Sequence, residues 1–299
     1  MDETPAKADE WEARCPGIIR AVHQENGGHG MAVLAGLREA QGTYYKVVDS
    51  DDWLDATALS TMLSMLRGFE ERDMRVDLFI SNYVYEKVYE NKRNAVSYRS
   101  ALPRKKVFGW NEIGHFRPDQ NLLMHSLCYR TDVLRSAELP MPAHTFYVDN
   151  IYAYVPLPRC KTLYYADIDL YRYFIGREGQ SVNEATMVKR LDQQFRITRI
   201  MMESYHLYTE VAEPRLRAYM MHYFTMMMTI CSVFTKLSDD PAMPGNLRKL
   251  WDDLKQFDEK MYRKARWGLL GIGTNLPTKA GEKITLGGYH LAEKIFKFN

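Results

Sequence analysis

The alternation of strand-like and helix-like segments in the first ninety residues is the feature that most constrains the fold. Apolar and β-branched runs predict strands, and apolar residues at helical spacing predict the helices between them. The predicted strands are 18–24, 43–48 and 76–89, and the predicted helices are 5–14, 31–42 and 55–74. Alternating strands and helices are typical of α/β layered folds with at least some parallel strands. We therefore expect an α/β fold.

The rest of the chain changes character twice. Residues 91–183 are rich in Tyr, Pro and Arg, with a strand-like piece at 161–174, and we expect them to form the far half of the same domain with long functional loops. Residues 184–299 are mostly helical in pattern. Within them, 219–234 is apolar but shorter than the roughly 20 residues of a spanning helix, so it predicts a buried helix. Residues 268–283 predict a Gly-rich linker before a final basic amphipathic helix.

Composition excludes some classes of protein. The net charge is only +2, so composition gives no argument for nucleic-acid binding. The N-terminus has no apolar core of a signal peptide, so we expect a cytoplasmic protein. Four scattered cysteines have no metal-ligand spacing and predict free thiols in a reducing compartment. They are Cys15, Cys128, Cys160 and Cys231.

The segment YYKVVDSDDW, residues 44–53, ends an apolar strand with three carboxylates, Asp49, Asp51 and Asp52. In α/β sheets, ligands bind at the carboxyl ends of strands. Neighbouring carboxylates repel each other unless a cation lies between them, and hard oxygen ligands suit Mg²⁺ or Mn²⁺, which commonly bridge to substrate phosphates. The alternative is that Asp51 or Asp52 caps the following helix. Capping accounts for one of the three acids.

These residues resemble the DxD motif of family-2 glycosyltransferases, which have the GT-A fold. The family pattern upstream reads N-x-G, three residues, A-R-N, one residue, G-L. Here residues 26–37 read NGG, HGM, AVL, Ala35 and GL, which matches the frame without a gap. Val33 and Leu34 replace the Arg and Asn of the family pattern, so any polar contact of those two residues is absent or supplied elsewhere.

The resemblance covers residues 1–183 and implies a GT-A-like mixed sheet flanked by helices, followed by the helical region 184–299. In HTFYVDNIYAY, Asp149 matches the family's catalytic base more loosely, with Val148 where a Glu is common; a helix N-cap at Asp149 is the alternative. Residues 171–183 resemble a loop that closes over the donor diphosphate. The donor-binding residues so implied are Asn26, Gly27, Gly28, Asp49, Asp51, Arg177, Gln180 and Ser181.

The implied reaction is metal-dependent transfer of a sugar, with inversion, from a nucleotide-diphosphate sugar to an acceptor hydroxyl. Asp49 and Asp51 would hold Mg²⁺ or Mn²⁺ on the diphosphate, and Asp149 would act as general base. The donor is a UDP-sugar by default, and the acceptor is a glycan or a lipid-linked molecule. The final helix would then lie on an anionic membrane surface at the inner face, or else pack on its own domain.

Alternatives concern the start of the chain and its activity. Asp2 and Thr4 fit the end of the family's D-G-S-x-D-x-T motif, so we expect an N-terminally truncated member that lacks two central strands; a divergent start is the alternative. A non-catalytic sugar-binding or nucleotide-binding domain is the rival function. A haloacid-dehalogenase-type phosphatase is a weaker one, because Trp53 stands where those enzymes carry Thr or Val. His29 could approach phosphate, and a histidine in a surface loop is the default interpretation.

Overall fold

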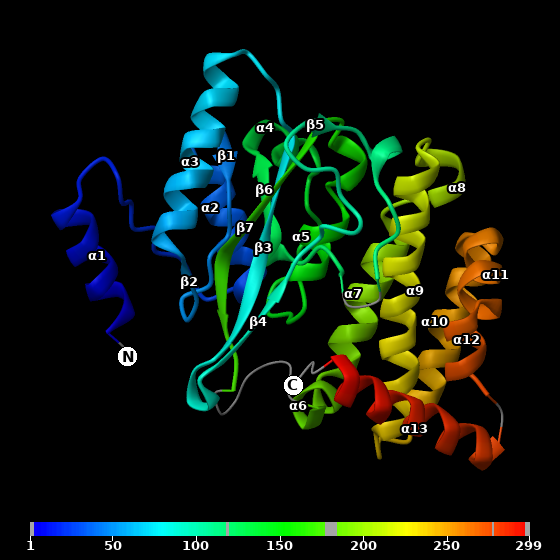
Figure 1. Cartoon of the computed structure of the whole chain (residues 1–299). Coiled ribbons are helices and arrows are strands. Elements are labelled where there is room, and N and C mark those ends of the chain that lie inside the picture. The colour runs from blue at the N-terminus through cyan, green and yellow to red at the C-terminus, as the bar shows by residue number, and fades with distance from the viewer. Residues whose placement is uncertain (1–2, 118–119, 177–183, 277, 297–299) are drawn as a thin grey trace.

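The computed structural model describes residues 3–117, 120–176, 184–276 and 278–296 and contains a mixed sheet flanked by helices (Figure 1). The strand order is β1-β6-β3-β7-β2, with β4 added to β3 and β5 added to β7. β3 and β7 are parallel, and the other described pairs are antiparallel. The mixed α/β sheet confirms the predicted fold class. The strands are β1 (Tyr44–Tyr45), β2 (Trp53–Leu54), β3 (Leu78–Lys87), β4 (Lys92–Val96), β5 (Val107–Phe108), β6 (Leu127–Arg130) and β7 (Leu163–Phe174).

The pairing of β3 with β7 forms the centre of the sheet. The first residues of β3, such as Leu78, have no exposed surface, because helices cover both faces of the sheet at this point. Just before β3, the buried Asp77 carboxylate accepts hydrogen bonds from the backbone N–H groups of Lys161 (2.7 Å) and Thr162 (3.1 Å). These bonds align the start of both strands. The register then shifts around Asn82.

The helices near the N-terminus, two of which pack into separate hydrophobic clusters, lie to the left of the sheet in the view of Figure 1. They are α1 (Thr4–Arg14), α2 (His29–Glu39) and α3 (Ala56–Glu71), and α4 (Thr131–Ser136) and α5 (Asp149–Tyr154) follow later. α3 packs Met62, Leu66 and Phe69 into a cluster with sheet residues. Asp55 caps α3 by accepting a hydrogen bond from the Ala58 N–H. The capping interpretation of Asp51 or Asp52 was therefore wrong.

Two predicted elements differ from the structure. Residues 18–24 form no strand, and Ile18 is 87% exposed, because this segment has no described strand beside it to share backbone hydrogen bonds. Residues 268–283 are largely helical instead of a linker, in α12 (Leu269–Thr274) and α13 (Thr278–Phe296). Glycine there permits close packing: a Cβ on Gly271 would lie 1.9 Å from the carbonyl oxygen of Ala265.

The remaining helices form the predicted C-terminal helical region. They are α6 (Glu184–Lys189), α7 (Leu191–Glu203), α8 (Leu207–Glu210), α9 (Pro214–Leu237), α10 (Met243–Phe257) and α11 (Glu259–Trp267). α9 is the buried helix predicted at 219–234, and its Met-rich faces join a core that extends from Val33 on α2 to Ala265 on α11. In the part of the chain that the structure describes, no helix is both long and apolar enough to cross a bilayer.

Short 3₁₀ turns complete the fold at η1 (Val88–Glu90), η2 (Trp110–Glu112), η3 (Met124–Ser126) and η4 (Leu157–Arg159). The four cysteines are free thiols, as predicted, and all except Cys15 are buried.

Candidate functional site

A cleft of about 730 Å³ lies where the chain leaves β1. Its walls come from the start of α2, the acidic loop after β1, η3, the segment before α5, and Tyr173 of β7. The carboxylates predicted from sequence meet here, because Asp49, Asp51 and Asp149 all line the cleft. Asp49 and Asp149 are about a hundred positions apart in the sequence, yet they share one site.

Asp52 fixes the acidic loop to the sheet. Its Oδ2 accepts a hydrogen bond from the Tyr171 hydroxyl (2.6 Å), and its Oδ1 accepts one from the Phe174 N–H (2.9 Å). Burial raises the pKa of Asp52 to about 6, although both hydrogen bonds oppose the rise. The Tyr171 hydroxyl also accepts a hydrogen bond from the backbone N–H of Asp49 (3.2 Å). One tyrosine of β7 thus orders both ends of the Asp49–Asp52 turn.

Asp49 is paired with His29. The His29 Nε2 lies 3.0 Å from the Asp49 Oδ1, which ties the first residue of α2 to the acidic loop. Burial acts to raise the pKa of Asp49, but the hydrogen bond from His29 and the positive charge of protonated His29 outweigh it, and the pKa is lowered. The hydrogen bond to Asp49 raises the pKa of His29. His29 is thus exposed, as expected of a surface histidine, but it begins α2 instead of lying in a loop, and it lines the cleft.

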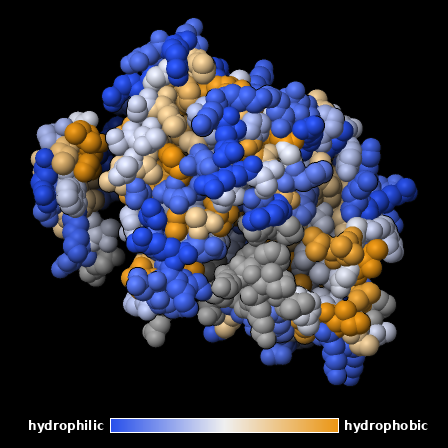
Figure 2. All heavy atoms as spheres, in the orientation of Figure 1, coloured by the Kyte–Doolittle hydropathy of each residue, from blue (hydrophilic) through white to orange (hydrophobic). Residues whose placement is uncertain are grey.

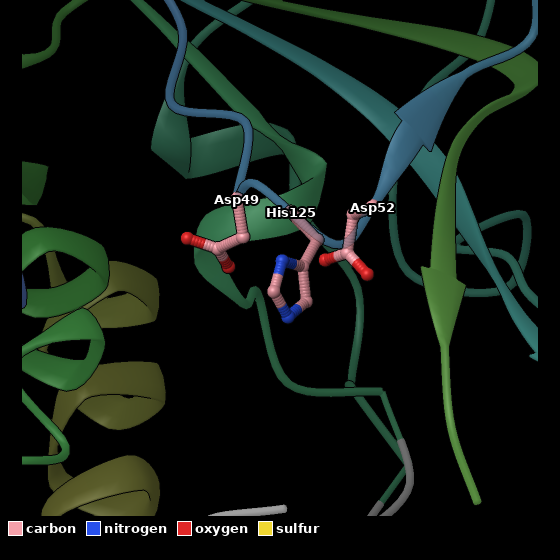
Figure 3. A group of neighbouring side chains, drawn as sticks. All are labelled: Asp49, Asp52 and His125. Atoms are coloured by element: carbon pink, nitrogen blue, oxygen red, sulfur yellow. The ribbon is translucent and has the colours of Figure 1, made fainter. Parts of the chain in front are cut away.

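Asp49, Asp52 and His125 are neighbours, with the imidazole between the two carboxylates (Figure 3). One ligand atom from each lies within 4.8 Å of the others. His125 is buried, and its Nδ1 has no hydrogen-bond partner among the described residues. Burial lowers the pKa of His125 to about 4, so the imidazole is neutral at neutral pH and able to bind a metal. Two carboxylates and a neutral imidazole fit a divalent cation such as Mn²⁺.

Lys46, which also lines the cleft, holds the backbone around His125 in place. Its Nζ donates hydrogen bonds to the backbone carbonyls of His125 (2.7 Å) and Leu127 (3.3 Å). The ammonium also lies 5.2 Å from the centre of the Tyr171 ring. Burial lowers the pKa of Lys46 to about 8. Sequence inspection missed Lys46, Asp52 and His125 as site residues; Asp52 stood beside the DxD motif, whereas His125 lies in an apolar run that carries no signal.

Asp149 is the first residue of α5, and Val148 occupies the N-cap position. The alternative of an Asp149 N-cap was therefore wrong. Burial raises the pKa of Asp149, and the charge of His29 partly opposes this. A carboxyl group with a raised pKa in a cleft is typical of a general base. The next residue, Asn150, accepts a hydrogen bond at Oδ1 from the Tyr223 hydroxyl of α9 (3.0 Å), which fixes the start of α5.

The Asn26–Gly28 loop contacts the segment before Asp149. The Gly28 N–H donates to Asn26 Oδ1 (3.0 Å), and the His144 N–H donates to the Gly27 carbonyl (2.7 Å). Gly28 has a φ of +82°, and a Cβ there would lie 3.2 Å from the His144 Cα. Asn26, Gly27 and Gly28 are not among the residues that line the cleft; their loop instead contacts the segment that leads to Asp149. The predicted donor residues Arg177, Gln180 and Ser181 lie outside the described residues.

Comparisons with known proteins agree with this geometry. Residues 1–130 match the model of glycosyl transferase family 2. EpsH of Bacillus subtilis (strain 168), which is named as a glycosyltransferase, is 34% identical over 85 residues, or 28% of this chain and 23% of EpsH. The crystal structure of S. aureus TarS superposes with a TM-score of 0.57 over 97% of this chain and 48% of TarS, at 13% identity, which shows a shared fold.

This chain spans about a quarter of EpsH and about half of TarS. The family match starts at residue 1 and ends with β6, so it contains the DxD loop and His125. The similarity to glycosyl transferase family 2 therefore covers residues 1–130 of the 299, the part of the chain that carries the acidic loop.

Proposed function

We propose that this protein transfers a sugar from a nucleotide-diphosphate sugar to an acceptor hydroxyl with inversion. The observation that carries the proposal is the meeting of Asp49, Asp51 and Asp149 on one cleft of about 730 Å³. Residues 1–183 would hold the donor, and the helical region 184–299 would support the site. A UDP-sugar is the default donor, and a glycan or lipid-linked molecule is the acceptor.

The donor diphosphate would lie at the acidic loop. Asp49, Asp52 and His125 would hold the metal, with Asp51 facing the cleft beside them. A bound divalent cation would supply positive charge to the departing diphosphate. The imidazole in this set favours Mn²⁺ over Mg²⁺, because Mg²⁺ prefers oxygen ligands. Tyr171 and His29 would keep Asp49 in place before the donor arrives.

Asp149 would act on the acceptor. Its carboxylate would accept the proton of the acceptor hydroxyl while that oxygen attacks the anomeric carbon from the face opposite the diphosphate, which inverts the configuration. The raised pKa of Asp149 makes it a stronger base than an ordinary Asp. Asn150, held by Tyr223, fixes the backbone from which Asp149 extends. The buried free thiols support a cytoplasmic setting for the reaction.

The first experiment measures thermal stabilisation by UDP and Mn²⁺. A ligand at about 100 times its dissociation constant adds about 2.7 kcal/mol to the unfolding free energy. We expect a shift that needs both UDP and Mn²⁺ and that is lost in Asp49→Ala and His125→Ala. Asp252→Ala, an exposed helical position on α10, is the matched control and should keep the shift.

Turnover separates an enzyme from a non-catalytic binding domain. Wild-type protein should consume labelled UDP-sugar in the presence of Mn²⁺ and an acceptor mixture. Asp149→Asn should still bind UDP and Mn²⁺, with turnover reduced by about 10²–10⁴-fold. Stabilisation by UDP and Mn²⁺ with no consumption of any UDP-sugar tested would support the binding-domain alternative. A protein that is folded yet shows neither response would contradict a UDP-sugar site.

A further inference from the structure

Exposed apolar side chains gather at one corner of the C-terminal helices. Of fifteen large hydrophobic residues found exposed in the described part of the chain, five lie within residues 267–284. Leu269 is 90% exposed and Trp267 is 62% exposed. Figure 2 shows hydrophobic surface at the end of the molecule where Figure 1 places α12 and α13. We call this set the apolar corner: Trp267, Leu269, Leu270, Ile272 and Ile284.

Backbone packing explains why these side chains face outward. α12 approaches the end of α11 through Gly271, which is buried and has no room for a Cβ. Contact through a glycine leaves the neighbouring Leu and Ile side chains of α12 pointing away from α11. The Thr285 hydroxyl donates to the carbonyl of Gly273 (2.8 Å), which places Ile284 of α13 beside α12. The exposure is therefore built into the fold of this corner.

Basic residues surround the apolar corner. Residues 259–283 contain six Lys or Arg and two Glu, a net charge of +4, whereas the whole chain carries +2, so the remainder carries −2. Lys264, Lys279 and Lys283 are exposed and form no ion pair with any residue in the described ranges. The Arg266 guanidinium lies 4.9 Å from the centre of the Trp267 ring. Positive charge thus coincides with the exposed apolar side chains.

We propose that the apolar corner and its basic rim bind the surface of an anionic phospholipid bilayer. Trp and short apolar side chains enter the boundary between headgroups and acyl chains, while Lys and Arg contact the anionic headgroups. A protein partner fits less well, because Lys is depleted in protein–protein interfaces whereas it is enriched here. The corner lies on α11, α12 and α13, away from the acidic cleft, so membrane binding does not depend on the proposed transferase activity.

The test is sedimentation of the full chain with lipid vesicles. Vesicles of phosphatidylcholine that contain about 30% of the anionic lipid phosphatidylglycerol are compared with vesicles of pure phosphatidylcholine, because a negative surface potential attracts basic residues. We expect binding to the anionic vesicles, little binding to the neutral ones, and a decrease in binding with added salt. Trp267 fluorescence should shift to the blue on binding, and that change should vanish in Trp267→Phe.

Two sets of variants separate the charge from the apolar contact. Changing Lys264, Lys279 and Lys283 together to Gln should weaken binding to anionic vesicles about 100-fold, because each basic residue contributes about fivefold. Leu269→Glu should also abolish sedimentation. The matched controls are Leu63→Glu, an exposed leucine on α3, and a triple change of Lys7, Lys92 and Lys106 to Gln; both should bind as the wild type does.

Three results would overturn the proposal. The first is no sedimentation of the wild-type chain with anionic vesicles. The second is binding that the lysine and Leu269 variants leave unchanged. The third is a stable dimer in solution that Leu269→Glu dissociates, since the corner would then be an interface between two copies of the chain.

Discussion

The hydroxyl group of Tyr171 links the acidic loop to the sheet, and its removal is the sharpest test of the site. Tyr171 is fully buried on β7. Its hydroxyl donates to the Asp52 carboxylate (2.6 Å) and accepts from the backbone N–H of Asp49 (3.2 Å). Tyr171→Phe removes both bonds and keeps the ring, so it leaves no cavity larger than one oxygen atom.

The expected loss follows from these two bonds. A hydrogen bond to a charged group contributes about 1.5–3 kcal/mol, and a buried N–H left without a partner adds about 1 kcal/mol. Tyr171→Phe should therefore lower the unfolding free energy by about 2–4 kcal/mol, measured by urea unfolding at neutral pH. Since Asp49 and Asp52 both lose their anchor, the thermal shift with UDP and Mn²⁺ should shrink as well.

Tyr154→Phe is the matched control for this experiment. Tyr154 is also fully buried, but its hydroxyl has no hydrogen-bond partner among the residues that the structure places. Its removal should leave stability unchanged or slightly higher, because an unsatisfied buried polar group is unfavourable. Equal losses in Tyr171→Phe and Tyr154→Phe would refute the anchoring role of Tyr171. A large loss of stability with unchanged Mn²⁺ and UDP binding would refute its link to the site.

Three further predictions follow from the same contacts. Gly28→Ala should lower the unfolding free energy by about 1–3 kcal/mol in a thermal unfolding experiment, since φ is +82° and the added Cβ would meet the backbone of His144. Gly245→Ala is the control: this glycine is helical and its Cβ would lie in open space, so the change should be neutral or stabilising in the same experiment. Asp149→Asn should reduce turnover by about 10²–10⁴-fold and increase stability at neutral pH, because burial raises the pKa of Asp149 and so penalises its charged form. That gain in stability should fade as the pH falls toward the pKa of an ordinary carboxyl group. As the pH is lowered, wild-type turnover should decline at a higher pH than it would with a base of ordinary Asp pKa. A pH profile of turnover that stays flat on the acidic side would contradict Asp149 as the base. Asp55→Ala should lower the unfolding free energy by about 1 kcal/mol through loss of the α3 cap, without changing the UDP and Mn²⁺ shift.

Local patterns predicted the elements whose partners lie within the same α/β unit. α2, α3 and β3 have strong periodicity, and DSDDW carries its motif in consecutive residues. β7 was predicted as the strand-like segment 161–174. In these cases burial and local propensity favour the same structure, so the sequence is sufficient.

Residues that depend on distant contacts escaped prediction. His125 reaches Asp49 only because β6 pairs with β1 on one side and β3 on the other, which brings η3 under the acidic loop. Lys46 then bonds to the carbonyl of His125, 79 positions away in the chain. Residues 18–24 have the composition of a strand, but strand propensity takes effect only where a neighbouring strand offers hydrogen bonds. No local pattern contains that information.

The position of the proposed base shows how the helical region takes part in the site. Three bonds from the helices hold the segment that carries Asp149: Phe146 N–H donates to the Gln193 side chain (2.8 Å), Arg196 donates to the Thr145 hydroxyl (3.1 Å), and Tyr223 donates to Asn150 (3.0 Å). On the other side, His144 contacts the Gly27–Gly28 loop. The acidic loop is instead anchored to β7 and η3 of the sheet. The two halves of the cleft are therefore ordered by different parts of the fold, and the shared core between α9 and the sheet sets the spacing between them.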